Sequence, residues 1–395
     1  MTDTLRVLQL GQPLHVARCL GKAPNTKLHV LALTGNPRVN VRFSRYVSTF
    51  HAYRGEDDEA IISTIYSIVE RTKAEVVLPS FTLATRFVSA HQDVLSQFVA
   101  VPPSPAPDVI DMVSDKWLLA NYLARHKLCY PPTVLCTADE TFERDLRRLS
   151  FPVLLKPRED LTDGAGIRLF NGVKQLRVFL EENPEHLGRY IVQSLISGYD
   201  MGCNVLCQEG RILAFTIQRA YIPARRPYSP AAVIEFVEHE QVLDLVTRLV
   251  SALGWSGVAN VDLRYDEDSE QVRVLEFNPR YWTSLLGSLS AGVNFPYLHC
   301  LAGVGVPFSR PAYFNKRFVV KETLNQLSVQ RHRGEHERRL TLGDTAWRYD
   351  IADPLPNVVK LVRSTFKWVN KGAKNRYRTP HYSPARKNTD EDQRL

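Results

Sequence analysis

Four prolines within seven residues, from Val101 to Pro107, divide this chain in two. Proline fixes φ and lacks a backbone N–H, so this stretch can be neither a helix nor a central strand. We therefore predict a domain boundary here, with a first domain at residues 1–107.

The first domain alternates between two kinds of segment. Short apolar runs at 6–10, 28–33 and 75–79 suit strands, and the spacing at 14–20 and 60–69 suits helices. Strands that alternate with helices indicate a parallel sheet of open α/β type. Such a sheet serves either as a scaffold or as one wall of a substrate site.

The turn after the first strand is Gly11-Gln12-Pro13. It lacks the Gly-x-Gly-x-x-Gly pattern that holds a dinucleotide pyrophosphate, so a nicotinamide-dependent oxidoreductase is disfavoured. Beyond the proline run, helical spacing begins at Asp108 and strand-like segments dominate residues 151–275, with one amphipathic helix near 241–253. The predicted fold class is therefore α/β plus α+β.

Composition is ordinary for a globular protein, since 44% of the 395 residues are apolar and 23% are charged. No apolar run reaches the length of about 18 residues that indicates a bilayer span. The N-terminus has no secretory pattern, and the six cysteines form no Cys-x-x-Cys pair, so we expect buried reduced thiols. Together these features predict a cytoplasmic protein.

The net charge of +8 is concentrated near the C-terminus. Nine Lys and Arg residues, and no Asp or Glu, lie between Lys360 and Lys387. The remainder of the chain is close to neutral, so a partnership with nucleic acid is not indicated.

The same region has apolar residues at helical spacing, with basic residues on the opposite face. We favour a helix that packs its apolar stripe onto its own domain. The alternative is peripheral contact of residues 355–374 with an anionic membrane surface. The polar sequence at 375–395 predicts a disordered tail. The apolar positions are Leu355, Val358, Val359, Val362, Phe366 and Val369.

Two strand-like apolar runs, 257–261 and 272–275, each lead into polar residues. Carboxylate and amide oxygens are the ligands that Mg²⁺ prefers, and water and substrate phosphates fill its remaining positions. An arginine beside them would hold an anion. Taken alone, the same pattern also suits a β-hairpin with a polar solvent face. The polar residues are Asp262, Glu276, Asn278 and Arg280.

Two lysines precede these strands. Lys156 closes the apolar run 151–155, and a lysine there is costly unless an anion meets it. A loop with Gly164 and Gly166 follows, and backbone N–H groups of such loops close over phosphates. Lys116 begins the helix after the proline run, where by itself it would be an ordinary surface charge.

A further segment, 190–200, reads as a strand, a turn and an acidic residue, Asp200. An extended backbone can meet the edge of adenine and an aspartate can accept from ribose hydroxyls, although an ordinary strand–turn–strand has the same pattern.

The segment 218–228 is basic and aromatic. It either clamps an acidic substrate, through Arg219, Arg225 or Arg226, or forms a solvent-exposed loop. The aromatic residues at 281–282 either line an acceptor pocket or belong to the core.

In this order, the pieces resemble the ATP-grasp superfamily, in particular the carboxylate–amine/thiol ligases related to the ATP-binding part of carbamoyl-phosphate synthase. The resemblance covers roughly residues 110–303, and its most specific part is Leu275 to Arg280. It implies a pre-ATP-grasp α/β domain at 1–107 and an ATP-grasp domain at 108–305 with a lid at about 130–200. A C-terminal extension at 306–374 and the tail at 375–395 follow.

The resemblance also implies roles for single residues. Many relatives carry an acidic residue at position 193, where this chain has glutamine. Arg280 would stabilise the transferred phosphoryl group. The ATP-binding residues would be Lys116 and Lys156 at the phosphates, Gln193 and the Ile196 backbone at adenine, and Asp200 at the ribose. The Mg²⁺ ligands would be Asp262, Glu276 and Asn278.

The activity so implied is ATP-dependent, with a carboxylate converted to an acyl phosphate and then attacked by an amine. The expected cofactors are ATP and two Mg²⁺ ions, for which Mn²⁺ can substitute. The expected partners are small-molecule acids and amines, and a homodimer is one candidate assembly. The competing hypothesis is a non-catalytic ATP-binding sensor or assembly protein, which retention of all three metal-ligand positions disfavours.

Overall fold

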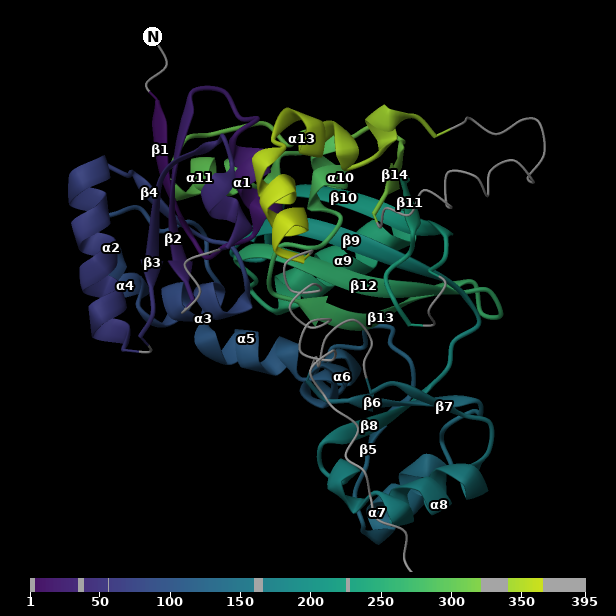
Figure 1. The fold of residues 1–395 in the computed structure, drawn as a ribbon. Helices are drawn as coiled ribbons and strands as arrows, with labels where there is room; N and C mark the ends of the chain where they lie inside the picture. Colours follow the sequence, from purple (N-terminus) through teal and green to yellow (C-terminus); the bar gives the residue numbers. More distant parts are fainter. Residues whose placement is uncertain are drawn as a thin grey trace, which may run out of the picture.

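The protein is described by a computed structural model over residues 4–34, 39–55, 57–159, 166–224, 228–320 and 340–364. Three sheets carry the fold, with helices packed on their faces (Figure 1). Within these ranges, the helices are too short or too polar to cross a membrane.

The N-terminal sheet is parallel and has the strand order β3-β2-β1-β4. Its strands β1 (Leu5–Leu10), β2 (Thr26–Leu33) and β4 (Val76–Pro79) confirm the open α/β prediction. The strand β3 (Val47–Tyr53) was missed because its Ser, Thr and His residues interrupt the apolar pattern on an edge strand. The other elements here are α1 (Leu14–Leu20), η1 (Asn40–Phe43), α2 (Asp58–Thr72), α3 (Thr82–Ala90) and α4 (Gln92–Leu95).

Residues 101–106 have neither helix nor strand, as predicted, but Pro107 begins α5 (Pro107–Ser114), because the first turn of a helix tolerates proline. Helix α6 (Lys116–Arg125) follows. The division of the chain into domains at residue 107 stays a prediction. A small antiparallel sheet comes next, in the order β5-β8-β6-β7. It consists of β5 (Thr133–Leu135), β6 (Val153–Pro157), β7 (Arg168–Phe170) and β8 (Tyr190–Ser194), with α7 (Glu140–Leu146), α8 (Val173–Glu182) and η2 (Pro184–His186).

The large sheet is antiparallel, in the order β13-β12-β9-β10-β11-β14. The helix α9 (Glu240–Ala252), as predicted, packs an apolar stripe onto one face. Helices α10 (Leu285–Ser290) and α11 (Phe295–Gly303) join the other face to the N-terminal sheet in a shared core. The strands are β9 (Gly198–Gln208), β10 (Arg211–Ile222), β11 (Val233–Phe236), β12 (Gly257–Asp266), β13 (Gln271–Asn278) and β14 (Arg317–Val319).

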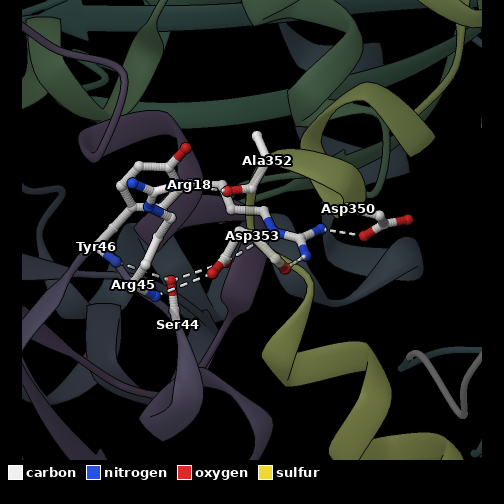
Figure 2. A network of polar contacts seen from close by, with 7 residues as sticks. All are labelled: Arg18, Ser44, Arg45, Tyr46, Asp350, Ala352 and Asp353. Carbon is white, nitrogen blue, oxygen red and sulfur yellow. Dashed lines mark hydrogen bonds and ion pairs between the residues drawn. The ribbon is translucent and has the colours of Figure 1, made fainter.

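The C-terminal part returns to the N-terminal sheet through η4 (Leu342–Asp344) and α13 (Trp347–Ala352). Asp353 is buried and accepts from Arg18 Nε at 3.2 Å, from Ser44 Oγ at 2.8 Å and from the Arg45 N–H at 2.9 Å (Figure 2). Arg18 also meets Asp350 at 2.5 Å. Separating the two segments would leave buried charges without a partner, which is costly. The network therefore holds the C-terminal segment on α1.

The basic amphipathic helix corrects one expectation. Residues 355–364 are helical, but Leu355, Val358 and Val362 are 57%, 51% and 46% exposed. The favoured packing of this stripe onto its own domain is therefore wrong over 355–364. Periodicity reveals an apolar face but not what covers it. Phe366, Val369 and the tail at 375–395 lie outside the described residues.

His299 of α11 joins the proline stretch to the large-sheet domain. Its Nε2 donates to the Pro103 carbonyl at 2.8 Å, and its Nδ1 accepts from the Tyr281 hydroxyl at 3.0 Å. Burial lowers the pKa of His299 from 6.5 to about 4. The neutral imidazole therefore serves both partners.

Acid should destabilise the fold through this histidine. In the unfolded chain its pKa returns to about 6.5, so the unfolded state binds the extra proton between the two pKa values and stability rises with pH across that window. Between about pH 7 and about pH 5, His299 should account for a loss of about 2 kcal/mol in the free energy of unfolding. Urea unfolding followed by tryptophan fluorescence measures it.

His299→Gln does not titrate and should lose this part of the pH dependence. Replacement of the exposed His126 by Gln is the matched control. An undiminished pH dependence in His299→Gln would contradict the assignment.

Candidate active site

The hairpin β12–β13 brings the predicted metal ligands together. Asp262 lies directly opposite Glu276, and Asn260 lies directly opposite Asn278. Alternation along a strand puts all four side chains on one face of the sheet. Asn278 Nδ2 donates to Asp262 Oδ2 at 3.0 Å. The polar side chains of the hairpin therefore lie together on one face of the sheet and are not divided between its two faces.

Lys116 reaches this face from the first turn of α6. Asp115 caps the helix by accepting from the Trp117 N–H at 2.8 Å, and its other oxygen accepts from Arg158 Nε at 2.9 Å. The Lys116 N–H donates to the Arg158 carbonyl at 3.0 Å, so the helix start is tied to the end of β6. Lys116 Nζ then lies 3.3 Å from Glu276 Oε1.

Lys156 approaches from the small sheet. It is buried on β6, and its Nζ donates to Gln193 Oε1 of β8 at 2.9 Å. Burial lowers the pKa of Lys156, and the nearby negative charge of Glu276 opposes that effect. Gln193 Nε2 donates to Thr133 Oγ1 at 3.0 Å. The Gln193 side chain is therefore engaged by Lys156 and Thr133, which ties the position predicted for adenine to the position predicted for phosphate.

The segment predicted to meet adenine and ribose is held by Arg264, which sequence reasoning missed. Arg264 donates to the carbonyls of Ile196 at 2.6 Å and Gly198 at 2.7 Å, and its Nη1 lies 2.5 Å from Asp200 Oδ1. The available signal was an arginine two residues after Asp262 in an apolar strand. Arg264 thereby holds the backbone at Ile196, where the contact with adenine is predicted.

Arg280 follows the metal strand and folds back onto it. Its Nη2 donates to Asn278 Oδ1 at 3.3 Å, and its N–H donates to the Asn278 carbonyl at 2.8 Å. The pKa of His15 on α1 is lowered to about 4, mainly by burial and next by the charge of Arg280. The charge of Arg280 therefore acts on α1 of the N-terminal domain, and whether the N-terminal sheet is a scaffold or one wall of the site stays a prediction.

Of the substrate residues predicted from the basic segment, Arg219 is not on this face. Arg219 donates to Glu235 Oε2 at 2.7 Å, and strand alternation puts it on the opposite face of β10 from its neighbour Gln218. Arg225 and Arg226 lie outside the described residues, as does the part of the glycine loop at 160–165. Tyr281 and Trp282 are buried in the shared core.

The donor set at the hairpin fits Mg²⁺. Within the described residues, no three His, Cys, Asp or Glu side chains lie together as metal ligands, and the set here consists of two carboxylates and one amide. Mg²⁺ takes one or two carboxylates and shares its other positions with water and phosphates. Asp262, Glu276 and Asn278 would hold it beside two lysines suited to phosphates.

Part of this chain is similar to a known domain family. Residues 113–284 match the family model of the ATP-grasp domain. The vancomycin B-type resistance protein of Enterococcus faecalis is 23% identical over 179 residues, which is 41% of this chain and 50% of that protein. The carbamoyl phosphate synthase large chain of Clostridium beijerinckii is 23% identical over 253 residues, covering 61% of this chain and 22% of that protein. The chain therefore spans half or less of the length of these relatives.

Two solved structures show the same fold. An L-amino acid ligase from Bacillus licheniformis has a TM-score of 0.58 at 19% identity and covers 78% of this chain and 76% of its own. An N5-carboxyaminoimidazole synthetase from Staphylococcus aureus in complex with ADP has a TM-score of 0.60 at 15% identity, with 81% of each chain covered. The match to the family model and the likeness of the solved structures together identify an ATP-grasp domain at residues 113–284 of this chain, on a fold shared with these enzymes.

Proposed function

We propose that the protein is an ATP-dependent ligase that joins a small-molecule carboxylate to an amine and releases ADP and phosphate. The observation that carries the proposal is the convergence of Lys116 and Lys156 on the face that holds Asp262 and Glu276. Two lysines opposite two carboxylates suit a triphosphate and its metal ions, and both lysines are buried there.

The reaction has two steps. A carboxylate oxygen of the acid attacks the γ-phosphorus of ATP, the bond to the β–γ bridging oxygen breaks, and ADP leaves. The amine nitrogen then attacks the acyl carbon, the bond from that carbon to the phosphate oxygen breaks, and the nitrogen loses a proton. A free carboxylate is a poor electrophile, so the acyl phosphate makes the second step possible.

The residues of this chain act by positioning and by charge. Lys116 and Lys156 would hold the phosphates, and Arg280 would stabilise the charge on the transferred phosphoryl group. The hinge that Arg264 fixes would hold adenine through the Ile196 backbone, with Asp200 at the ribose. Bound at Asp262, Glu276 and Asn278, two Mg²⁺ or Mn²⁺ ions would neutralise phosphate charge. Each of these roles is part of the proposal.

Loss of Glu276 should abolish turnover. Glu276→Ala removes a metal ligand and the ion-pair partner of Lys116, so we expect ADP release to fall by at least about a hundredfold. The assay supplies Mg²⁺·ATP with pairs drawn from bicarbonate, amino acids and simple amines. ADP is measured enzymatically and the product by mass spectrometry.

Glu267→Ala, in the turn of the same hairpin, is the matched control and should keep wild-type turnover. Near-normal ADP release by Glu276→Ala would refute the metal-site assignment. AMP and pyrophosphate as products would refute the acyl-phosphate route. ATP binding with no turnover over the whole panel would favour the non-catalytic sensor, and a homodimer is tested by light scattering on the same sample.

The C-terminal helix supports a second proposal, which is peripheral contact with an anionic membrane. The exposed stripe at Leu355, Val358 and Val362 carries it, because the adjoining sequence from Lys360 to Lys387 has nine Lys and Arg residues and no Asp or Glu. Apolar insertion combined with attraction to anionic lipid is the usual basis of such binding.

Vesicle co-sedimentation tests this proposal. The protein should pellet with phosphatidylcholine vesicles that contain phosphatidylserine and remain in solution with phosphatidylcholine alone. Leu355→Glu with Val358→Glu should weaken binding by at least about tenfold, because both place charge on the inserting face. Val178→Glu, at an exposed apolar residue of α8, is the control. Equal binding to both vesicle types would contradict the proposal.

A further inference from the structure

Gln218 of β10 lies on the face of the large sheet that carries the proposed site. It lies opposite Gly202 of β9, and Gly202 in turn lies opposite Asp262 of β12. A methyl group placed on Gly202 would lie 3.2 Å from Gln218 Nε2. The glycine therefore leaves room for the Gln218 carboxamide beside the row that carries the metal ligands.

A chain of buried amides connects Gln218 with those ligands. Asn278, Asn260, Asn204 and Thr216 are direct cross-strand neighbours over four strands. Asn278 Nδ2 donates to Asn260 Oδ1 at 3.4 Å, and Asn260 Nδ2 donates to Asn204 Oδ1 at 3.1 Å. Asn204 Nδ2 donates to Thr216 Oγ1 at 3.2 Å and to Gln218 Oε1 at 3.4 Å. Apolar side chains at these buried positions would cost less free energy to bury than amides do, so we infer that the amides have a functional role.

The donor-to-acceptor direction of this row of amide hydrogen bonds is set by Asp262 at one end of the row. An ionised Asp262 only accepts hydrogen bonds, so Asn278 must turn its NH₂ group toward it. Each amide then turns its oxygen toward the site end and its NH₂ toward the next strand. The Gln218 oxygen accordingly faces Asn204, where it also accepts from Ser284 Oγ at 3.1 Å.

The other end of the Gln218 carboxamide is thereby fixed as a donor. Gln218 Nε2 makes no hydrogen bond to any residue in the described part of the chain, and the side chain is only partly buried. An NH₂ group fixed in this way suits a ligand oxygen.

We propose that Gln218 binds the acid substrate, with its NH₂ group donating to a carboxylate oxygen, and that Asn204 and Asn260 are positioning residues that orient it. The inference rests on the ligase function proposed above and names a contact to its acid. It replaces Arg219, the neighbour that faces away from the site, as the substrate residue of β10.

The test compares two neighbouring substitutions on one strand. Gln218→Met keeps the size and removes the donors, so KM for the acid should rise by about tenfold or more, with KM for ATP within about twofold of wild type. Arg219→Met should change neither constant. The acid is the one that gives the fastest ADP release in the panel above. A rise in KM for ATP instead, or no change in either constant, overturns the proposal.

Asn204→Asp separates positioning from mere stability. Aspartate still accepts from Asn260 but cannot donate to Gln218, so the carboxamide can turn and KM for the acid should rise while KM for ATP stays within about twofold. Ser284→Ala removes the other donor to Gln218 and tests the same point if Asn204→Asp does not fold. A purely structural role would instead lower the melting temperature and kcat and leave KM for the acid unchanged, which would overturn the positioning role.

If the wild type releases no ADP with any acid and amine pair of the panel, the proposed ligase function fails. This result is obtained before any variant is made, so it is distinguished from failure of the Gln218 proposal. Acetate is then titrated by calorimetry into protein loaded with Mg²⁺ and ADP. Binding about tenfold weaker in Gln218→Met than in the wild type supports the carboxylate contact, and equal binding overturns it.

Discussion

Asp262 and Glu276 lie directly opposite each other on antiparallel strands, where two like charges repel. The fold tolerates the pair because positive charge surrounds it. Lys116 lies 3.3 Å from Glu276, and Lys156 is close enough for both carboxylates to raise its pKa against the opposing effect of burial. The lysines are equally costly to bury without the carboxylates. This mutual compensation explains why three separate segments of the chain must meet at one face of the large sheet.

The elements that carry these charges are held by further polar contacts away from the face itself. Asp115 caps α6 and pairs with Arg158, so Lys116 and the end of β6 move together. Arg264 does the same for the segment from Ile196 to Asp200. Charged hydrogen bonds have directional geometry, so each fixes a backbone turn and not merely a distance. The buried Arg18–Asp353 pair holds α1 against the C-terminal segment (Figure 2).

The sequence made part of this arrangement predictable. Lys156 and the hairpin residues were visible because a charge in an apolar strand needs a reason, and their roles remain predictions. The edge strand β3 was not visible, since its side chains are half exposed and mixed in polarity. The exposure of Leu355 and Val358 could not be predicted either, because helical periodicity is the same whether a face is covered or bare. Arg264 escaped because its three acceptors come from a distant segment of the chain.

Gln218 and Arg219 show that residue charge alone does not predict which side chain of a strand faces a site. Neighbouring residues on a strand face opposite sides, so an error of one position moves a residue from the site to the far face. Arg219 attracted attention as a cation that could bind an acid, yet Glu235 engages it there. The site already has Arg280 and two lysines, and a further cation would raise the repulsion among them. A neutral amide adds a directed donor without that repulsion, provided that something fixes its orientation, and the asparagines of β9, β12 and β13 supply that constraint.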